Sequence, residues 1–451
     1  MKRLLKGARV VDPAGGRDGA FDVLIHGGAI ARVEKDLKPE AGTDVVDLPP
    51  GLVVCPGLID MHVHLREPGQ EHKETVATGT SAAVAGGFTA VACMPNTSPV
   101  NDNAGITEYI LKKAAEADLA RVYPIGAVSF GQKGERLADI AELRRAGCVA
   151  ITDDGHPVAT ALLMRRALEY SSMFGLLVIE HCEEQTLKGD GVAHEGFHAS
   201  TLGLRGIPGE AESIMALRDI ALAELTGGRV HVAHMSARQT LDAVRWGKSR
   251  GARVTCEVTP HHFVLTDDML GAPIPYDTNV KMNPPLRSAA DRDAMLQGLA
   301  DGSVDVIATD HAPHHYDEKH VEFDRAPFGI TGLETAVSLA FDRLVHAGVL
   351  PLPRLVELLS VNPARILGVP GGSLAEGAPA DLTILAPDLA VTVSAARMRS
   401  KAKNTPFDGW RLRGGVAATI VGGRTVYVND DVKVGLRVGE RQGGRGNGVK
   451  G

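Results

Sequence analysis

Short apolar runs alternate with helix-like segments along most of the chain, and this alternation constrains the fold more than any other feature. Eight runs have the composition of strands: Leu58–Met61, Thr89–Met94, Val122–Val128, Cys148–Thr152, Leu176–Glu180, Arg229–Ala233, Arg253–Val258 and Val304–Thr309. Several are continuously apolar, as expected of strands buried on both faces of a parallel sheet. Eight strand–helix units predict an α/β fold, a (β/α)8 TIM-type barrel, over residues 55–368. A doubly wound open sheet is the main rival on pattern alone.

The two ends of the chain lack this alternation. Residues 1–54 and 369–430 read as short strands separated by Gly and Pro turns. The strand-like runs are 9–11, 22–26, 29–33, 381–385, 391–394 and 417–428. Two segments of such similar character predict one small composite β-sandwich domain, built from both ends of the chain, beside the barrel. The last stretch, residues 431–451, is rich in glycine, and we expect a flexible tail there.

Composition excludes several classes of partner. The net charge is −7 and no long block of Lys or Arg occurs, so we expect binding neither to nucleic acid nor to anionic membranes. The longest apolar stretch, near residues 81–94, falls short of the roughly 20 residues that a membrane span needs. No apolar run of signal-peptide length follows the first residues, and the five cysteines form no CxxC pair. Both features favour a cytoplasmic protein with reduced thiols.

Side chains that bind metals follow several of the predicted strands. His62 and His64 come at the end of the first strand, and residues two apart in an extended chain project to the same face. The ends of later strands carry further candidates: Asp153, Asp154, His181, His234 and Asp310. The carboxyl ends of barrel strands share one face, so these side chains predict a site for two divalent ions. Imidazole with carboxylate suits zinc best, with cobalt, manganese and iron as alternatives.

A series of motifs surrounds these candidates. DMHVHLREPG spans residues 60–69, and ATDHAPH spans residues 308–314 and is followed by Lys319. Between them stand MPNT (94–97), TDDG (152–155), EHCE (180–183), HVAHMS (231–236), EVTPHH (257–262), MNPPLR (282–287) and APFG (326–329). With these motifs the chain resembles the amidohydrolase superfamily and, within it, bacterial dihydroorotases of the longer type. The resemblance extends to about residue 429.

The resemblance implies a ligand set for two Zn²⁺ ions: His62 and His64 for one, His181 and His234 for the other. Asp154 would bridge both ions together with a hydroxide. Asp310 would complete the first site and transfer the proton. Hydantoinases, allantoinases and shorter dihydroorotases bridge with a carbamylated lysine instead. The motif TDDG has no lysine, so no carbamylated lysine is expected here.

Some neighbours of these residues are alternatives. Asp153 could be the ligand in place of the aspartate that follows it, and His231 in place of the second histidine of HVAHMS. The family pattern favours the second member of each pair. His261 and His262 follow the seventh strand and resemble ligands, but the family does not use them so, and we expect them to be structural.

By resemblance, the reaction is the reversible hydrolysis of the cyclic amide of (S)-dihydroorotate to N-carbamoyl-L-aspartate in pyrimidine synthesis. The hydroxide attacks the ring carbonyl, and Asp310 acts as general base and then as general acid. Dihydroorotate carries a carboxylate that hydantoin and allantoin lack, and Arg66 offers a bidentate donor for it. The resemblance gives the other substrate contacts: His64, Asn96, Asn283, His314, Phe328 and Gly329. The polar segment 314–329 is long enough to be a mobile loop over the site.

Three other functions compete with this interpretation. A hydantoinase or allantoinase would act on another cyclic amide, but Arg66 and the missing lysine disfavour it. A non-catalytic dihydroorotase-like partner of aspartate transcarbamoylase would have lost metal ligands, which this chain keeps. A metal-dependent deaminase would not carry the DHAPH and NPPLR motifs together. The resemblance also suggests a homodimer and association with aspartate transcarbamoylase.

Overall fold

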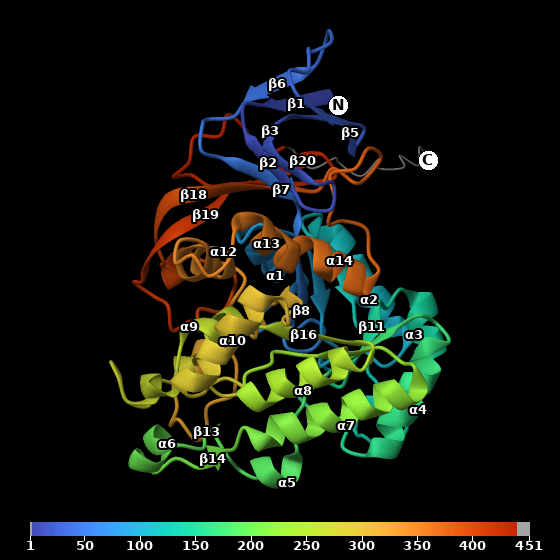
Figure 1. Cartoon of the computed structure of the whole chain (residues 1–451), viewed down its shortest axis with the longest axis vertical. Coiled ribbons are helices and arrows are strands. Elements are labelled where there is room, and N and C mark those ends of the chain that lie inside the picture. Colours follow the sequence, from blue (N-terminus) through green and yellow to red (C-terminus); the bar gives the residue numbers. More distant parts are fainter. Residues whose placement is uncertain (1, 440–451) are drawn as a thin grey trace, which may run out of the picture.

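The middle of the chain alternates between strands and helices, as the sequence predicts (Figure 1). The structure is a computed structural model that describes residues 2–439. Within that range this part of the chain contains eight strands that pair in parallel: β8 (Leu58–Val63), β9 (Phe88–Cys93), β10 (Arg121–Pro124), β11 (Ala150–Ile151), β12 (Leu177–Glu180), β15 (Val230–Val232), β16 (Val254–Val258) and β17 (Val306–Ile307). Each overlaps one of the eight predicted strands.

These strands pair in the order of the sequence. One sheet runs β8–β9–β10, and the other runs β11–β12–β15–β16–β17. Parallel bridges join Gly126 to Ile151 and Val63 to His311, so the two sheets meet at two places. A doubly wound sheet reverses its strand order at a switch point. The sequential order therefore contradicts that rival.

Helices connect the strands and cover them. The main ones are α1 (Val76–Ala85), α2 (Ala104–Ala117), α3 (Ile140–Ala146), α4 (Ala161–Ser172), α7 (Glu210–Thr226), α8 (Arg238–Ser249) and α10 (Ala289–Asp301). Several begin at a side chain that accepts a hydrogen bond from the first turn, as Thr75, Asn103 and Ser288 do. Alternate side chains of the strands enter two apolar clusters: Val91 packs in the larger cluster with the helices, and Met61 in a smaller one.

Short elements that the sequence did not predict lie in the connections. They are α5 (Gln185–Lys188), β13 (Ala193–His194), α6 (Phe197–Thr201), β14 (Gly206–Ile207), α9 (Pro260–Val264) and α11 (Tyr316–Lys319). After β17 the chain forms α12 (Ala336–Ala340), α13 (Leu352–Val356) and α14 (Asn362–Leu367). The elements in the connections have only two to five residues, too few for a hydrophobic period to show in the sequence.

Strands from both ends of the chain share one sheet, and Figure 1 shows them side by side. The N-terminal strands are β1 (Lys2–Lys6), β2 (Arg9–Asp12), β3 (Arg17–Ala20), β4 (Asp22–His26), β5 (Ala29–Glu34), β6 (Asp44–Asp47) and β7 (Val53–Pro56). The C-terminal ones are β18 (Leu382–Thr392), β19 (Arg411–Val421) and β20 (Arg424–Val428). The sheets run β5–β4–β1–β6 and β20–β19–β18–β7–β2–β3. β7 crosses the expected boundary at residue 55 and pairs with both β2 and β18.

The expected tail needs a correction at its start. Val434 and Leu436 are buried in the apolar cluster of the terminal sheets. These two buried apolar side chains fix residues 434–436 on the protein, because burial removes their surface from water. The rest of the expected tail, residues 440–451, lies outside the described residues.

Two further observations concern composition. Among residues 2–439, every helix is too short or too polar to pass through a lipid bilayer. All five cysteines are buried and unpaired in the structure. The cytoplasmic location expected from their spacing stays a prediction.

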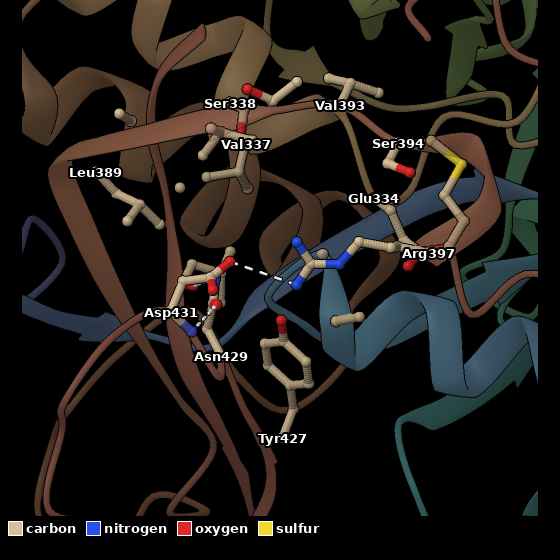
Figure 2. A pocket seen from close by; sticks show the side chains of 18 residues that line it. Glu334, Val337, Ser338, Leu389, Val393, Ser394, Arg397, Tyr427, Asn429 and Asp431 are labelled. Atoms are coloured by element: carbon tan, nitrogen blue, oxygen red, sulfur yellow. Dashed lines mark hydrogen bonds and ion pairs between the residues drawn. The ribbon is translucent and has the colours of Figure 1, made fainter. Parts of the chain in front are cut away.

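A cavity of about 340 Å³ lies between the β18–β19 hairpin and helices α1 and α12, and we call it the hairpin cavity (Figure 2). Arg397 and Asp431 face each other across it, with Arg397 Nη2 and Asp431 Oδ2 3.4 Å apart. Glu334 accepts hydrogen bonds from the backbone N–H groups of Arg399 and Ser400. These contacts pair the charged side chains of this cavity within the protein.

Candidate metal centre and substrate cavity

Five histidine and aspartate side chains meet where strands of the two parallel sheets end. They come from β8 and the residues directly after β8, β11, β12 and β15: His62, His64, Asp154, His181 and His234. Each has an exposed fraction of 5% or less. They form two groups of three, one with His62 and His64 and one with His181 and His234, and both groups include Asp154. Within each group the candidate ligand atoms lie within 4.8 Å of one another.

Asp154 lies at the centre of this cluster. Its Oδ1 is 3.4 Å from His62 Nε2, 3.5 Å from His234 Nε2 and 3.8 Å from His181 Nδ1. Its Oδ2 is 3.5 Å from His64 Nε2. One carboxylate thus faces all four imidazoles. This is the position that a ligand shared between two ions occupies.

Asp310 adjoins the first of the two groups. Its Oδ1 is 3.1 Å from His64 Nε2 and 3.5 Å from His62 Nε2. Asp310 has a φ of 47°, and two other predicted site residues, Arg66 (60°) and His234 (30°), also have positive φ. Such left-handed backbone is strained for side chains of this size and concentrates at functional sites.

A further carboxylate, Glu257 in β16, orients the histidines from behind. It accepts hydrogen bonds from His62 Nδ1 at 2.6 Å, from His231 Nε2 at 3.1 Å and from the His234 backbone N–H at 3.1 Å. Because Nδ1 of His62 donates to Glu257, its Nε2 is the ring nitrogen that faces Asp154. Sequence reasoning assigned no role to Glu257, although a charged residue inside a buried strand was a usable signal.

Unpaired buried atoms test whether the cluster fits a metal. His62 Nε2, Asp154 Oδ1 and His234 Nδ1 are buried and have no hydrogen-bond partner among residues 2–439. Buried polar atoms are rarely left unpaired in native proteins, so these atoms call for a partner. Imidazole nitrogen and carboxylate oxygen are ligands for divalent transition metals. The residues present therefore fit the metal dependence of the amidohydrolase superfamily.

The carboxylates and imidazoles of the cluster shift each other's pKa values toward the charged forms. Burial acts to raise the pKa of Asp154, but the charge of His62 and the nearby imidazole of His234 hold this pKa well below its usual value. Burial acts to lower the pKa of His62, and the carboxylates of Asp154 and Glu257 outweigh that effect and raise it. Burial likewise acts against ionisation of Asp310, and its contact with His64 lowers the pKa of Asp310. These carboxylates are thus ionised, the form in which they bind metal and accept protons.

The structure separates the members of each ambiguous pair. Asp153 points away from the cluster and accepts hydrogen bonds from the backbone N–H groups of Val128 and Ser129. His231 contacts Thr255 and Glu257 rather than Asp154. Neither residue belongs to the two groups of candidate ligands.

The two adjacent histidines after β16 also lie outside those groups. His262 contacts the Thr259 hydroxyl and donates to the Pro284 carbonyl, and burial lowers the pKa of His262 to about 4. Burial also lowers the pKa of His261, whose Nε2 has no hydrogen-bond partner among residues 2–439. Both side chains are therefore neutral imidazoles packed beside the cluster.

A second cavity of about 190 Å³ opens onto this cluster, and we call it the substrate cavity. Its lining includes every residue that the sequence proposed for substrate contact: His64, Arg66, Asn96, Asn283, His314, Phe328 and Gly329. Asp154, His181, His234 and Asp310 line it too. Sequence reasoning missed Lys188, which comes from the unpredicted helix α5 and pairs with Glu183 at 2.7 Å.

Arg66 is one of two cationic residues, with Lys188, that line this cavity. Its Nε donates to the Pro313 carbonyl at 3.2 Å, and its Nη2 lies 3.4 Å from His314 Nε2. Burial lowers the pKa of Arg66 to about 10, which leaves the guanidinium charged at neutral pH. Burial and the charge of Arg66 lower the pKa of His314, so that imidazole is neutral. The cavity therefore presents a fixed positive charge beside the metal-binding cluster.

Comparison with known proteins places this geometry in a family. Residues 51–240 match the Dihydro-orotase-like family, and residues 332–427 match the Amidohydrolase family. A dihydroorotase of Geobacter metallireducens is 52% identical over 95% of this chain and 100% of its own length. One of Pelotomaculum thermopropionicum is 55% identical over 94% of this chain and 98% of its own. The chain belongs to the dihydroorotase family.

Solved structures agree with the fold of this dihydroorotase-family chain. The L-hydantoinase (dihydropyrimidinase) of Arthrobacter aurescens has a TM-score of 0.84 at 25% identity, over 96% of this chain and 98% of its own. The dihydropyrimidinase of Brevibacillus agri has a TM-score of 0.84 at 24% identity, over 95% of each chain. The predicted α/β class is confirmed, and so is the resemblance on which the sequence interpretation rested.

Proposed function

We propose that this member of the dihydroorotase family hydrolyses the cyclic amide of (S)-dihydroorotate to N-carbamoyl-L-aspartate and catalyses the reverse ring closure, a step of de novo pyrimidine synthesis. One observation carries the proposal: Arg66 shares a cavity with the metal-binding cluster. A guanidinium there can bind the carboxylate of dihydroorotate while the ring amide lies at the cluster. The names of relatives 52–56% identical over nearly the whole chain support the same substrate.

The cluster would hold two zinc ions. His62 and His64 would bind one ion, His181 and His234 would bind the other, and Asp154 would be shared between them. No lysine is needed as a bridge, because Asp154 already faces all four histidines. When bound, such ions lower the pKa of a water molecule towards neutral and polarise the carbonyl that it attacks.

The other residues bind the substrate and move protons. Arg66, Asn96 and His314 bind the carboxylate of the substrate, and Asn283 contacts the ring. Asp310 accepts the proton of the attacking water and returns it to the ring nitrogen as the amide bond breaks. The pKa of Asp310 lies below its usual value, so its carboxylate is unprotonated at neutral pH and has a free position for that proton. The backbone of Phe328 and Gly329 completes the cavity.

We also propose a finer architecture. Residues 55–368 form a closed (β/α)8 barrel, and residues 1–54 and 369–430 form one composite β-sandwich domain. Two parallel bridges between the sheets and an apolar cluster among alternate strand residues support closure. The family resemblance further suggests a homodimer and an association with aspartate transcarbamoylase. Size-exclusion chromatography with light scattering, with and without that partner, tests both assemblies.

The decisive test of the substrate is steady-state hydrolysis by the purified, zinc-loaded protein. L-Dihydroorotate, hydantoin and allantoin are compared under the same conditions. We expect kcat/KM for dihydroorotate to exceed the other two strongly, because only dihydroorotate has a carboxylate for Arg66. A preference for hydantoin or allantoin would assign the protein to that activity instead. No turnover of any of the three, with metal bound and aspartate transcarbamoylase added, would refute the proposal.

A further inference from the structure

Two buried lysines hold one wall of the substrate cavity, and this role rests on the proposed function. Lys281 and Lys319 have exposed fractions of 2% and 6%, and neither ammonium group has a carboxylate partner among residues 2–439. Buried lysines without a counter-ion are rare in proteins. Their hydrogen bonds explain why these two are present.

Lys319 donates to three backbone carbonyls. Its Nζ lies 2.9 Å from Pro327 O, 3.0 Å from Gly329 O and 3.3 Å from Lys281 O. An ammonium group has three N–H donors and no acceptor, so three carbonyls match its hydrogen-bonding capacity. Two of these carbonyls flank Phe328, which lines the substrate cavity.

Lys281 contacts the same segment from the other side. Its Nζ donates to Phe323 O at 2.7 Å and to Asp324 O at 3.0 Å. It also lies 4.8 Å from the centre of the Phe328 ring, within cation–π range. The backbone carbonyl of Lys281 accepts a hydrogen bond from Gly329 N–H at 2.9 Å. Lys281 stands two residues before Asn283, so the same contacts join two parts of the cavity wall.

The segment 320–329 contains no helix or strand, so its buried carbonyls need other donors. The lysines supply most of them, and His314 Nε2 adds a hydrogen bond to Phe328 O at 2.8 Å. Gly329 has a φ of 128°, and a Cβ there would lie 2.7 Å from Ala312 Cβ. The backbone at Gly329 therefore packs so closely against Ala312 that it leaves no space for a side chain.

We infer that Lys281 and Lys319 are positioning residues that hold the backbone of Pro327–Gly329 against the bound substrate. Apolar side chains of similar length would fill the same space but leave the carbonyls of Phe323, Asp324 and Pro327 without donors. Without these hydrogen bonds, the backbone of Pro327–Gly329 would become mobile beside the substrate, and the metal ligands would stay in place. The sequence predicted a mobile loop at 314–329, and these contacts identify what fixes its C-terminal half.

Lys319→Met tests the inference, with Lys281→Met as a second variant and Lys248→Met as a control away from the substrate cavity. Lys248 also donates to a backbone carbonyl, Ser303 O at 2.7 Å, but it does not line the substrate cavity. We expect Lys319→Met and Lys281→Met to raise KM for dihydroorotate by about tenfold or more, with kcat changed less and zinc content unchanged. Hydrogen exchange of residues 320–330 should accelerate in both variants and not in the control.

Each outcome has a distinct meaning. Unchanged KM in a folded Lys319→Met variant overturns the inference, even if exchange accelerates, because the lysine would then be purely structural. If Lys319→Met does not fold, Lys281→Met decides by the same measurements. If the wild-type protein does not hydrolyse dihydroorotate, the proposed function fails. Hydrogen exchange of residues 320–330 then tests the lysines by itself. An exchange rate that is the same in the lysine variants and the wild type would overturn their positioning role.

Discussion

The substrate cavity and the hairpin cavity differ in the side chains that line them. The hairpin cavity is larger, about 340 Å³ against about 190 Å³, yet its ion pair joins two side chains that are 68% and 63% exposed. In the substrate cavity, the histidines and aspartates are almost completely buried, and several of their atoms have no partner among residues 2–439. In this protein the volume of a cavity is therefore a poor indicator of a functional site, and buried ligand atoms without partners are a better one.

Backbone strain follows the same division. Arg66, His234 and Asp310 line the substrate cavity and have positive φ, whereas no such non-glycine residue lines the hairpin cavity in residues 2–439. Strain of this kind persists only where the surrounding structure enforces it. The surrounding structure thus keeps these three residues in a backbone conformation that non-glycine residues disfavour. Such strain is common at functional sites.

The largest expected effect is at the proton-transfer residue of the substrate cavity. Asp310→Asn keeps the shape of the side chain but removes the base, so kcat should fall by about 100-fold to 10,000-fold. The zinc content should stay near that of the wild type, because the four histidines and Asp154 are intact. Steady-state kinetics and elemental analysis measure the two quantities. Wild-type turnover in this variant would refute the proton-transfer role.

A second variant tests how the cavity selects its substrate. Arg66→Met removes a charged donor to the carboxylate, which is worth about 1.5–3 kcal/mol, so kcat/KM for dihydroorotate should fall by about tenfold to 150-fold. Any residual hydrolysis of hydantoin should change much less, since hydantoin has no carboxylate. Equal losses for both substrates would show that Arg66 acts on the cavity as a whole.

Glu257 has a smaller expected effect, and it acts on the metal. Glu257→Gln weakens the hydrogen bond that orients His62, so we expect metal affinity to fall by about 10-fold to 100-fold. Competition with a chelator of known affinity measures this change. Thr255→Val provides a control, because it removes a contact of His231 that does not reach Asp154. Unaltered affinity in Glu257→Gln would exclude an orienting role.

The smallest effect is expected in the hairpin cavity. Arg397→Gln breaks an exposed ion pair, and such pairs contribute about 0–1 kcal/mol. Unfolding by urea should shift by no more than that, and turnover of dihydroorotate should not change. A marked loss of turnover would break the comparison, because it would connect this cavity to catalysis.

The sequence predicted the strands that carry the site better than the connections between them. His62 and His64 are two residues apart at the end of an apolar run, and that local pattern suffices to predict a shared ligand role. Lys188 and Lys319 lie in short helices with no visible period, so their neighbours depend on tertiary packing. Glu257 differs from both, because the sequence shows a charged residue inside an apolar strand but not its partners. Those partners, His62 and His231, lie in other strands.

The terminal sheets show the same limit. Residues 417–428 read as one strand, but β19 ends at Val421 and β20 begins at Arg424. Gly422 and Gly423 both have positive φ and form the turn between them. The strands β1, β3, β6 and β7 were not predicted individually.

Titration of the metal-free protein with zinc, followed by turnover of dihydroorotate, tests the central claim most directly. If the buried cluster holds two ions that share Asp154, activity should rise with added zinc and saturate at two equivalents per chain. Asp154→Ala should abolish both the activity and the stoichiometric binding. Full activity without metal, or binding of two equivalents that survives the loss of Asp154, would contradict the account.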